Sequence, residues 1–108
     1  VALDAMINQR ETDVLCIYCA IGQRKSGVAG VIDDISMNGI REKTIVVASS
    51  EEDPPGLQFV TPYAAMSIGE YFRDRGRDVL LVLDDMTRHA WAYRELSLLL
   101  RRPPSRQI

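Results

Sequence analysis

The sequence predicts an α/β fold, in which one parallel sheet has helices flanking its faces. Three apolar runs of strand length, at 14–20, 44–48 and 79–83, are rich in Val, Ile and Leu. Nearly continuous apolar strands are typical of a sheet that is covered on both faces. Segments with helical spacing precede, separate and follow these runs, and such crossovers favour parallel pairing. We find no internal boundary, so we expect residues 1–108 to form a single partial domain.

Composition narrows the class of protein. Hydrophobic residues make up 46% and charged residues 26%, which is typical of a globular chain rather than a disordered one. The net charge of -2 argues against nucleic acid or an anionic membrane surface as the main partner. No apolar run approaches the roughly 20 residues that a transmembrane helix needs.

The opening of the chain already has helical spacing. Leu3, Met6 and Ile7 share one helical face, and neither an initiator methionine nor a capping residue precedes them. We therefore expect the sequence to begin within a helix, as a fragment of a longer protein.

The first strand carries a C-x-x-C pattern at Cys16 and Cys19. Residues three apart on a strand point to opposite faces, so the two thiols should not converge on a metal or form a disulfide. No second cysteine pair completes a zinc site. We expect both cysteines to be buried, small and apolar, in a reducing compartment.

Three helices are predicted around the second and third strands. Gly39 is predicted to end the first of these helices and Gly76 the second. Thr61 is predicted to be the N-cap of the second helix, with Pro62 at its first helical position. The third should end before the prolines at 103–104. The expected apolar positions are Val28, Val31, Ile32 and Ile35, then Ala64, Ile68 and Phe72, then Ala92, Leu96, Leu99 and Leu100.

Two segments are expected to lie outside regular structure. Residues 51–56 form a polar, proline-rich stretch that we expect to be a mobile loop. Residues 101–106 form a basic, extended tail whose prolines cannot continue a helix.

Ligands of parallel α/β sheets bind at the carboxyl ends of the strands, which directs attention to residues 21–27, 49–51 and 83–85. On the residues alone, Gln23 is most simply a polar loop residue after the first strand. Four apolar residues before Asp84 give the Walker B pattern, whose carboxylate holds Mg²⁺ near nucleotide phosphates. An alternative is that Asp84, Asp85 or Thr87 caps the next helix. A Walker A loop is absent from the sequence, and residues 22–27 have glycine and lysine in the wrong order for one.

The single histidine, His89, has no Ser or Cys nucleophile in a recognisable arrangement with it. We expect a surface or packing role for it.

Several segments together resemble the alpha subunit of F-type ATP synthases. That family has G-E-Y-F-R-D-x-G, matched at 69–76, an apolar strand ending in D-D, matched at 79–85, and A-Y-R-x-x-S-L-L-L-R-R-P-P, matched at 92–104. Its C-I-Y-x-A-I-G-Q is matched at 16–23, its L-Q-x-x-x-P-Y at 57–63, and residues 2–9 resemble the helix after its Walker A loop. Residues 27–38 and 51–56 follow the family weakly.

The resemblance implies a middle slice of a RecA-like P-loop NTPase core, that is, part of a nucleotide-binding domain without its Walker A loop. The intact subunit would bind ATP or ADP with Mg²⁺, with Gln23 and Asp84 as cofactor-binding residues and Asp84 at the metal. Catalytic relatives carry Glu where this chain has Gln23, and an amide has no basic site at neutral pH. The implied site is therefore non-catalytic and regulatory. We expect the isolated chain to be inactive and to bind no ATP, although the parent complex is an ion-translocating ATP synthase.

The resemblance also implies partners and location. The intact subunit would alternate with beta subunits in a hexamer around a central stalk, peripheral to the cytoplasmic face of the inner or plasma membrane. Ion transport would be coupled to ATP synthesis, with hydrogen ion as the expected ion. Exposed apolar surface in the chain alone should promote self-association.

Two other functions stay open at this stage. One is a flagellar or type III secretion export ATPase, and the other is a small α/β interaction module without a nucleotide role. Gln23 and the R-R-P-P at 101–104 favour the alpha subunit over the export ATPases.

Overall fold

The structure is a computed structural model that describes residues 6–9, 12–84 and 86–99. Its sheet contains β1 (Leu15–Gln23), β2 (Thr44–Ser50) and β3 (Val79–Asp84). The strand order is β2-β1-β3, and β1 pairs in parallel with both neighbours. The predicted parallel α/β sheet is thus confirmed, and each strand reaches one to three residues further at its carboxyl end than predicted.

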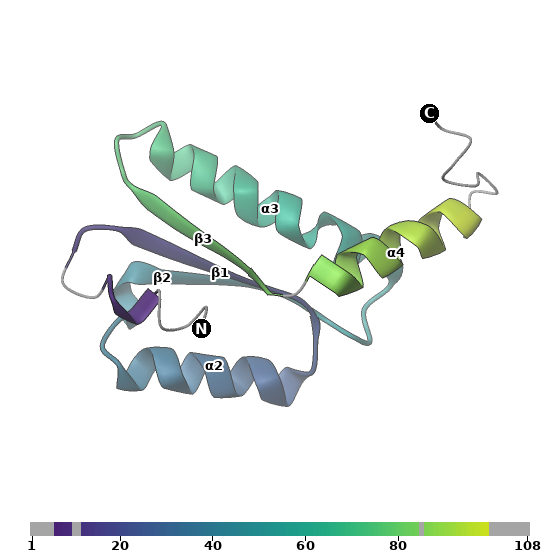
Figure 1. Ribbon diagram of the computed structural model, residues 1–108, viewed down its shortest axis with the longest axis horizontal. Helices are drawn as coiled ribbons and strands as arrows, with labels where there is room; N and C mark the ends of the chain where they lie inside the picture. Colours follow the sequence, from purple (N-terminus) through teal and green to yellow (C-terminus); the bar gives the residue numbers. More distant parts are fainter. Residues whose placement is uncertain (1–5, 10–11, 85, 100–108) are drawn as a thin grey trace.

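The helices cover the two faces of this sheet separately (Figure 1). Helix α2 (Lys25–Met37) lies on one face, and α3 (Pro55–Arg73) lies on the other. Helix α4 (Met86–Leu99) packs against α3, and a 3-10 turn, η1 (Arg41–Lys43), leads into β2. The β1–β2 and β2–β3 connections cross the sheet in opposite directions, so crossovers of the usual right hand place their helices on opposite faces.

The core consists of two apolar clusters that lie on the two faces of β1. The cluster facing α2 contains Met6, Cys16, Tyr18, Ala20, Ile35 and Ile40. The cluster facing α3 contains Ile17, Cys19, Ile21 and Ala65. Because side chains alternate along a strand, the central strand has a buried residue at every position of this stretch, as its unbroken apolar sequence predicted.

The two cysteines lie in different clusters, as predicted, and both are free and buried. Burial raises the pKa of the Cys16 thiol, against a smaller lowering by the charge of Lys43. Burial raises the pKa of the Cys19 thiol to about 11. Both thiols therefore stay protonated at neutral pH, which fits small apolar core residues.

The prediction for the start of α3 is wrong. The helix begins at Pro55, six residues before Thr61, with Pro54 as its N-cap residue. Proline suits this first position because its missing N–H would have no helical partner there. Thr61 is inside the helix, where its Oγ1 donates to the Leu57 carbonyl at 2.6 Å. Pro62 is also internal, and the loop before the helix is correspondingly shorter than predicted.

The buried face of α3 differs from the predicted one as a consequence. It consists of Gln58, Thr61, Pro62, Ala65 and Gly69. Ala64 is exposed, whereas Ile68 packs against the cluster that faces α3. The Gln58 amide nitrogen donates to the Asp53 carbonyl at 2.9 Å, which ties the short loop to the first turn of the helix.

Other helix predictions are confirmed where the structure describes them. Gly39 and Gly76 have φ values of 71° and 86° after the ends of α2 and α3, in the left-handed region that stops a helix. Ile32 is 44% exposed, so the apolar stripe of α2 is narrower than predicted. In α4, Ala92 is buried. The side chain of Leu99, residue Leu100, the tail 101–106 and residues 1–5 of the opening helix lie outside the described residues.

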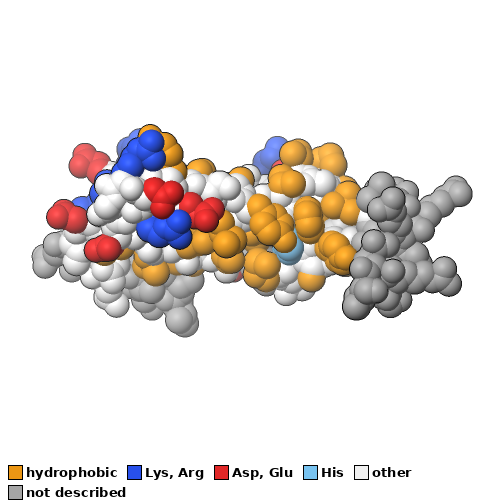
Figure 2. All heavy atoms as spheres, turned by 90° about the horizontal axis from the view of Figure 1, so that it is seen from above, with side chains coloured by type: hydrophobic (Ala, Val, Ile, Leu, Met, Phe, Trp, Pro, Cys, Tyr) orange, Lys and Arg blue, Asp and Glu red, His pale blue; other side chains and the backbone are white. Residues whose placement is uncertain are grey.

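Figure 2 shows apolar side chains gathered on the surface over α3 and α4. Large apolar side chains exposed on these two helices are Leu57, Val60, Tyr63, Met66, Tyr71, Met86, Trp91 and Tyr93. The His89 ring stacks on Phe59 with ring centroids 4.9 Å apart, which confirms a packing role. No helix in the described part of the chain is long and apolar enough to cross a membrane.

Candidate functional site

The carboxyl edge of the sheet brings together the two polar residues that the sequence singled out. Gln23 ends β1, Asp84 ends β3, and the two strands are neighbours with Ala20 paired to Asp84. After β1 the chain turns to α2 on one face, and after β3 it turns to α4 on the side of α3 (Figure 1). Chains that leave adjacent strands toward opposite faces open a crevice between them, which is where α/β proteins bind ligands.

A one-residue bulge in β1 sets the direction of Gln23. Ala20 pairs with Ala48 and Gln23 pairs with Ser50, so three steps along β1 match two steps along β2. Gly22 provides the extra residue with a φ of 63°, a conformation that glycine adopts without strain. Its N–H donates to Ser49 Oγ at 3.1 Å within the buried interior.

The bulge changes the face on which Gln23 lies. Strict alternation would put Gln23 on the same side as Cys19 and Ile21, toward α3. The extra residue returns it to the side of Ala20, and its Nε2 donates to the Asp84 carbonyl at 3.3 Å. Gln23 therefore uses one of its two amide N–H donors within the protein and keeps its carbonyl oxygen as an acceptor.

The Asp84 side chain has a partner that the sequence analysis missed. The Tyr18 hydroxyl donates to Asp84 Oδ2 at 2.6 Å, although the two residues are 66 positions apart in the sequence. Burial, and then the hydrogen bond and charge of Asp84, raise the pKa of Tyr18, so its hydroxyl remains a donor. The available signal was a tyrosine within a buried aliphatic strand, since a buried phenol needs a polar partner.

These residues enclose a small cavity of about 90 Å³. Its lining residues are Tyr18, Ala20, Gln23, Gly27, Val28, Val31 and Asp84. A cavity needs roughly 10–15 Å³ of this space to hold one water, so this one has room for water beside the Asp84 carboxylate. Carboxylate and amide carbonyl oxygens can bind Mg²⁺ directly, or they can accept hydrogen bonds from the waters bound to it.

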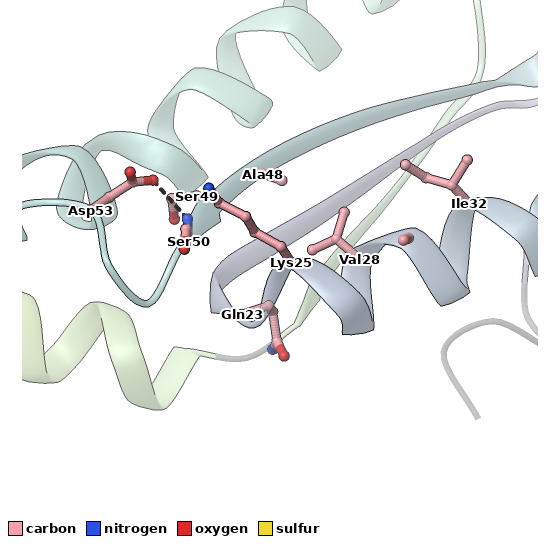
Figure 3. A pocket seen from close by; sticks show the side chains of 9 residues that line it. Gln23, Lys25, Val28, Ile32, Ala48, Ser49, Ser50 and Asp53 are labelled. Carbon is pink, nitrogen blue, oxygen red and sulfur yellow. Dashed lines mark hydrogen bonds between the residues drawn. The ribbon is translucent and has the colours of Figure 1, made fainter.

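A larger pocket of about 360 Å³ lies on the other side of Gln23 (Figure 3). The Lys25 side chain extends along it toward the end of β2, where Asp53 Oδ2 accepts a hydrogen bond from the Ser50 N–H at 2.7 Å. The Gln23 side chain points away from this loop (Figure 3). Gln23 lines both cavities, whereas Asp84 lines only the smaller one and Lys25 only the larger.

The other candidates do not enter this site. Asp85 lies outside the described residues, and Thr87 lies in the first turn of α4. Thr87 is therefore inside the helix and is not its N-cap residue. Within the described ranges, no group of three or more His, Cys, Asp or Glu side chains could hold a metal ion. Any cation at Asp84 would therefore be held by that carboxylate together with other oxygen ligands, such as amide or backbone carbonyl groups and waters.

Comparison with known proteins places this geometry in context. The sequence model of a family described as "ATP synthase alpha/beta family, nucleotide-binding domain" matches residues 1–108. The chain is 60% identical to ATP synthase subunit alpha 2 of Syntrophotalea carbinolica, with 99% of this chain and 20% of that protein aligned. It is 61% identical to ATP synthase subunit alpha 1 of Marinomonas sp. and 57% identical to ATP synthase subunit alpha of Methylobacillus flagellatus, with 99% of this chain and 21% of each protein aligned.

The curated relatives are much longer than this chain, which spans about a fifth of their length. The alignments nevertheless cover nearly all of its residues, including the edge formed by Gln23 and Asp84. The predicted resemblance to the alpha subunit is confirmed by these matches.

Proposed function

This chain belongs to the ATP synthase alpha/beta family, as part of its nucleotide-binding domain. From this premise we propose that it forms the part of the nucleotide site that binds Mg²⁺ in a rotary ATP synthase alpha subunit. The observation that carries the proposal is the hydrogen bond from Gln23 Nε2 to the Asp84 carbonyl, at the carboxyl ends of two neighbouring parallel strands. Nothing found for the chain favours an export ATPase or an interaction module.

In the proposed site, Asp84 holds Mg²⁺ with its carboxylate, directly or through a water. When bound, the metal would neutralise negative charge on the nucleotide phosphates. The small cavity beside Asp84 supports this role because it can hold a water next to the carboxylate.

Gln23 orients a water at this edge but does not activate it. Its Nε2 donates to the Asp84 carbonyl, which leaves the neutral carbonyl oxygen to accept a hydrogen bond from water. A glutamate at this position could take the proton of an attacking water, and a glutamine cannot. The proposed site therefore binds nucleotide without turning it over, as a regulatory site.

The remaining roles are those that the resemblance to the alpha-subunit family implies, and they are part of the same proposal. The intact subunit would work beside beta subunits and the central stalk, in a complex peripheral to the membrane that couples hydrogen ion transport to ATP synthesis. The phosphate cradle would come from parts of that subunit outside this chain. We propose that the chain alone binds no ATP, because Gln23 and Asp84 contribute no phosphate-binding backbone groups.

The test uses the full-length subunit that carries this chain and measures ATP affinity by calorimetry, with Mg²⁺ and with EDTA. Asp84→Asn should reduce the Mg²⁺-dependent gain in affinity by about tenfold or more, because a charge-assisted ligand contributes roughly 1.5–3 kcal/mol. Asp33→Asn, at an exposed position on α2, removes the same charge elsewhere and should leave the gain unchanged. An unchanged gain in Asp84→Asn would refute the assignment.

A second measurement tests the absence of catalysis. In the assembled complex with beta sites blocked, ATP should not be hydrolysed at this site. Hydrolysis that disappears in Gln23→Ala would show that the site is catalytic after all.

A further inference from the structure

Tyr18 combines a ring packed among apolar side chains with a hydroxyl group that reaches a carboxylate. It is buried in the cluster that faces α2, among Cys16, Ala20 and Ile35. A phenylalanine would fill the same volume beside these apolar neighbours. The hydroxyl instead reaches the polar edge of the sheet and donates to Asp84 Oδ2 at 2.6 Å.

The direction of Tyr18 follows from the strand register. Tyr18 and Ala20 lie on the same face of β1, and Leu80 and Val82 share that face of the neighbouring strand. Asp84 continues this alternation, so its carboxylate emerges on the side of Tyr18. Tyr18 pairs with Val82, two residues before Asp84, and its long side chain covers that distance.

The hydrogen bond constrains one oxygen of the carboxylate and not the other. Oδ2 accepts the short bond from the buried ring, whose own position is set by packing. Rotation of the carboxylate about its terminal bond would break this bond, so the orientation of Oδ1 is also set. Oδ1 receives no hydrogen bond from Tyr18, so it is the carboxylate oxygen with more capacity left for Mg²⁺ or its bound waters.

We infer that Tyr18 is a positioning residue of the magnesium site, because its hydroxyl holds Asp84 Oδ2 and so directs the other carboxylate oxygen to the cation. The inference rests on the proposed function of Asp84. Tyr18 itself contacts neither metal nor nucleotide. Partners of this kind, one step behind a metal ligand, typically change metal affinity by 10- to 100-fold.

The experiment compares Tyr18→Phe with the wild type in the full-length subunit. ATP dissociation constants are measured by calorimetry with Mg²⁺ and with EDTA, and their ratio gives the metal-dependent gain. Tyr18→Phe should lower this gain by about tenfold and leave affinity in EDTA unchanged, because the ring and its packing remain. Tyr71→Phe, at an exposed position of α3, removes the same hydroxyl elsewhere and should not alter the gain.

A double-mutant cycle separates positioning from folding. In the Asp84→Asn background, Tyr18→Phe should have no further effect on the gain, since the group that it positions is lost. Thermal melting of each variant shows whether it is folded. The electron paramagnetic resonance spectrum of bound Mn²⁺ should also change in Tyr18→Phe, which a packing role alone would not cause.

The outcomes distinguish the two proposals. If Asp84→Asn loses the gain and Tyr18→Phe keeps it within twofold, Tyr18 is a packing residue, and only the further inference fails. If Asp84→Asn keeps the gain, the metal role of Asp84 fails, and the inference about Tyr18 fails with it. An equal loss from Tyr18→Phe in both backgrounds would also overturn the positioning role.

Discussion

Gly22→Ala tests whether the bulge in β1 depends on a residue that tolerates a positive φ. Gly22 is buried, has a φ of 63°, and supplies the extra residue between Ala20 and Gln23. Alanine at this φ brings its Cβ close to a carbonyl oxygen, which costs about 1–2 kcal/mol. If the bulge is kept, the free energy of unfolding should fall by that amount.

The alternative is that the bulge is lost, and this is also costly. A regular strand would turn Gln23 toward α3 and break its hydrogen bond to the Asp84 carbonyl. The Gly22 N–H would also lose Ser49 Oγ. Each bond contributes about 1 kcal/mol, so neither route avoids a loss of about 1–2 kcal/mol. For a domain of this size, 1 kcal/mol corresponds to a Tm shift of roughly 4–8 °C.

The assay is denaturant unfolding of the 108-residue chain, with Gly30→Ala as the matched control. Gly30 lies in α2, where no atom lies within 4 Å of an added Cβ. The same substitution there should stabilise the protein by up to about 1 kcal/mol through helix propensity. A lower free energy of unfolding in Gly22→Ala, together with a higher one in Gly30→Ala, would support the role of the positive φ at Gly22. Gly22→Ala with the stability of the wild type would refute the account of the bulge.

Four further predictions concern packing, titration, association and nucleotide binding. Gly69→Ala should raise Tm, because the new Cβ would meet Ile17 Cδ1 and Val79 Cγ1 at an ordinary contact distance of 3.5 Å and alanine favours the helix by up to about 1 kcal/mol; a lower Tm would contradict this. Burial raises the pKa of Cys19 from 9.0 to about 11, so its contribution to stability is fully present below pH 9 and is lost as pH rises toward 11. Between these pH values the free energy of unfolding, measured by urea titration, should therefore fall less in Cys19→Ala than in the wild type. An equal fall in both proteins would count against this prediction. The isolated chain should self-associate through the apolar surface of α3 and α4, and a monomer by light scattering at high concentration would contradict this. The isolated chain should also show no ATP binding in calorimetry, which saturable binding of micromolar ATP would contradict.

Much of the fold could be predicted because the strands carry strong local signals. Three apolar runs give three parallel strands, and parallel strands end at one edge, which places Gln23 and Asp84 on the same edge. That the two are neighbours depends on the strand order β2-β1-β3. The two-residue period of a strand likewise separates Cys16 from Cys19.

The start of α3 could not be predicted because the sequence offers two valid signals. Pro55 and Pro62 both suit a first helical position, and Thr61 before Pro62 also resembles a cap. The earlier start holds in the fold because the Gln58 amide bonds the Asp53 carbonyl and helix residues from 58 onward bury against the sheet. The local sequence pattern alone does not distinguish a helix start at Pro55 from one at Pro62.

The sequence by itself determined the class of fold and the edge of the sheet where ligands bind, and its family resemblance predicted Gln23 and Asp84 as residues of the candidate site. Only the tertiary structure decided how those residues are oriented. The contact of Tyr18 with Asp84 joins residues 66 positions apart, and it depends on which strands are neighbours and on their register. The direction of Gln23 depends on a bulge that reverses strand alternation at Gly22. Composition and periodicity record which face a residue prefers, but a hydrogen bond across strands exists only when pairing has fixed the distance between them.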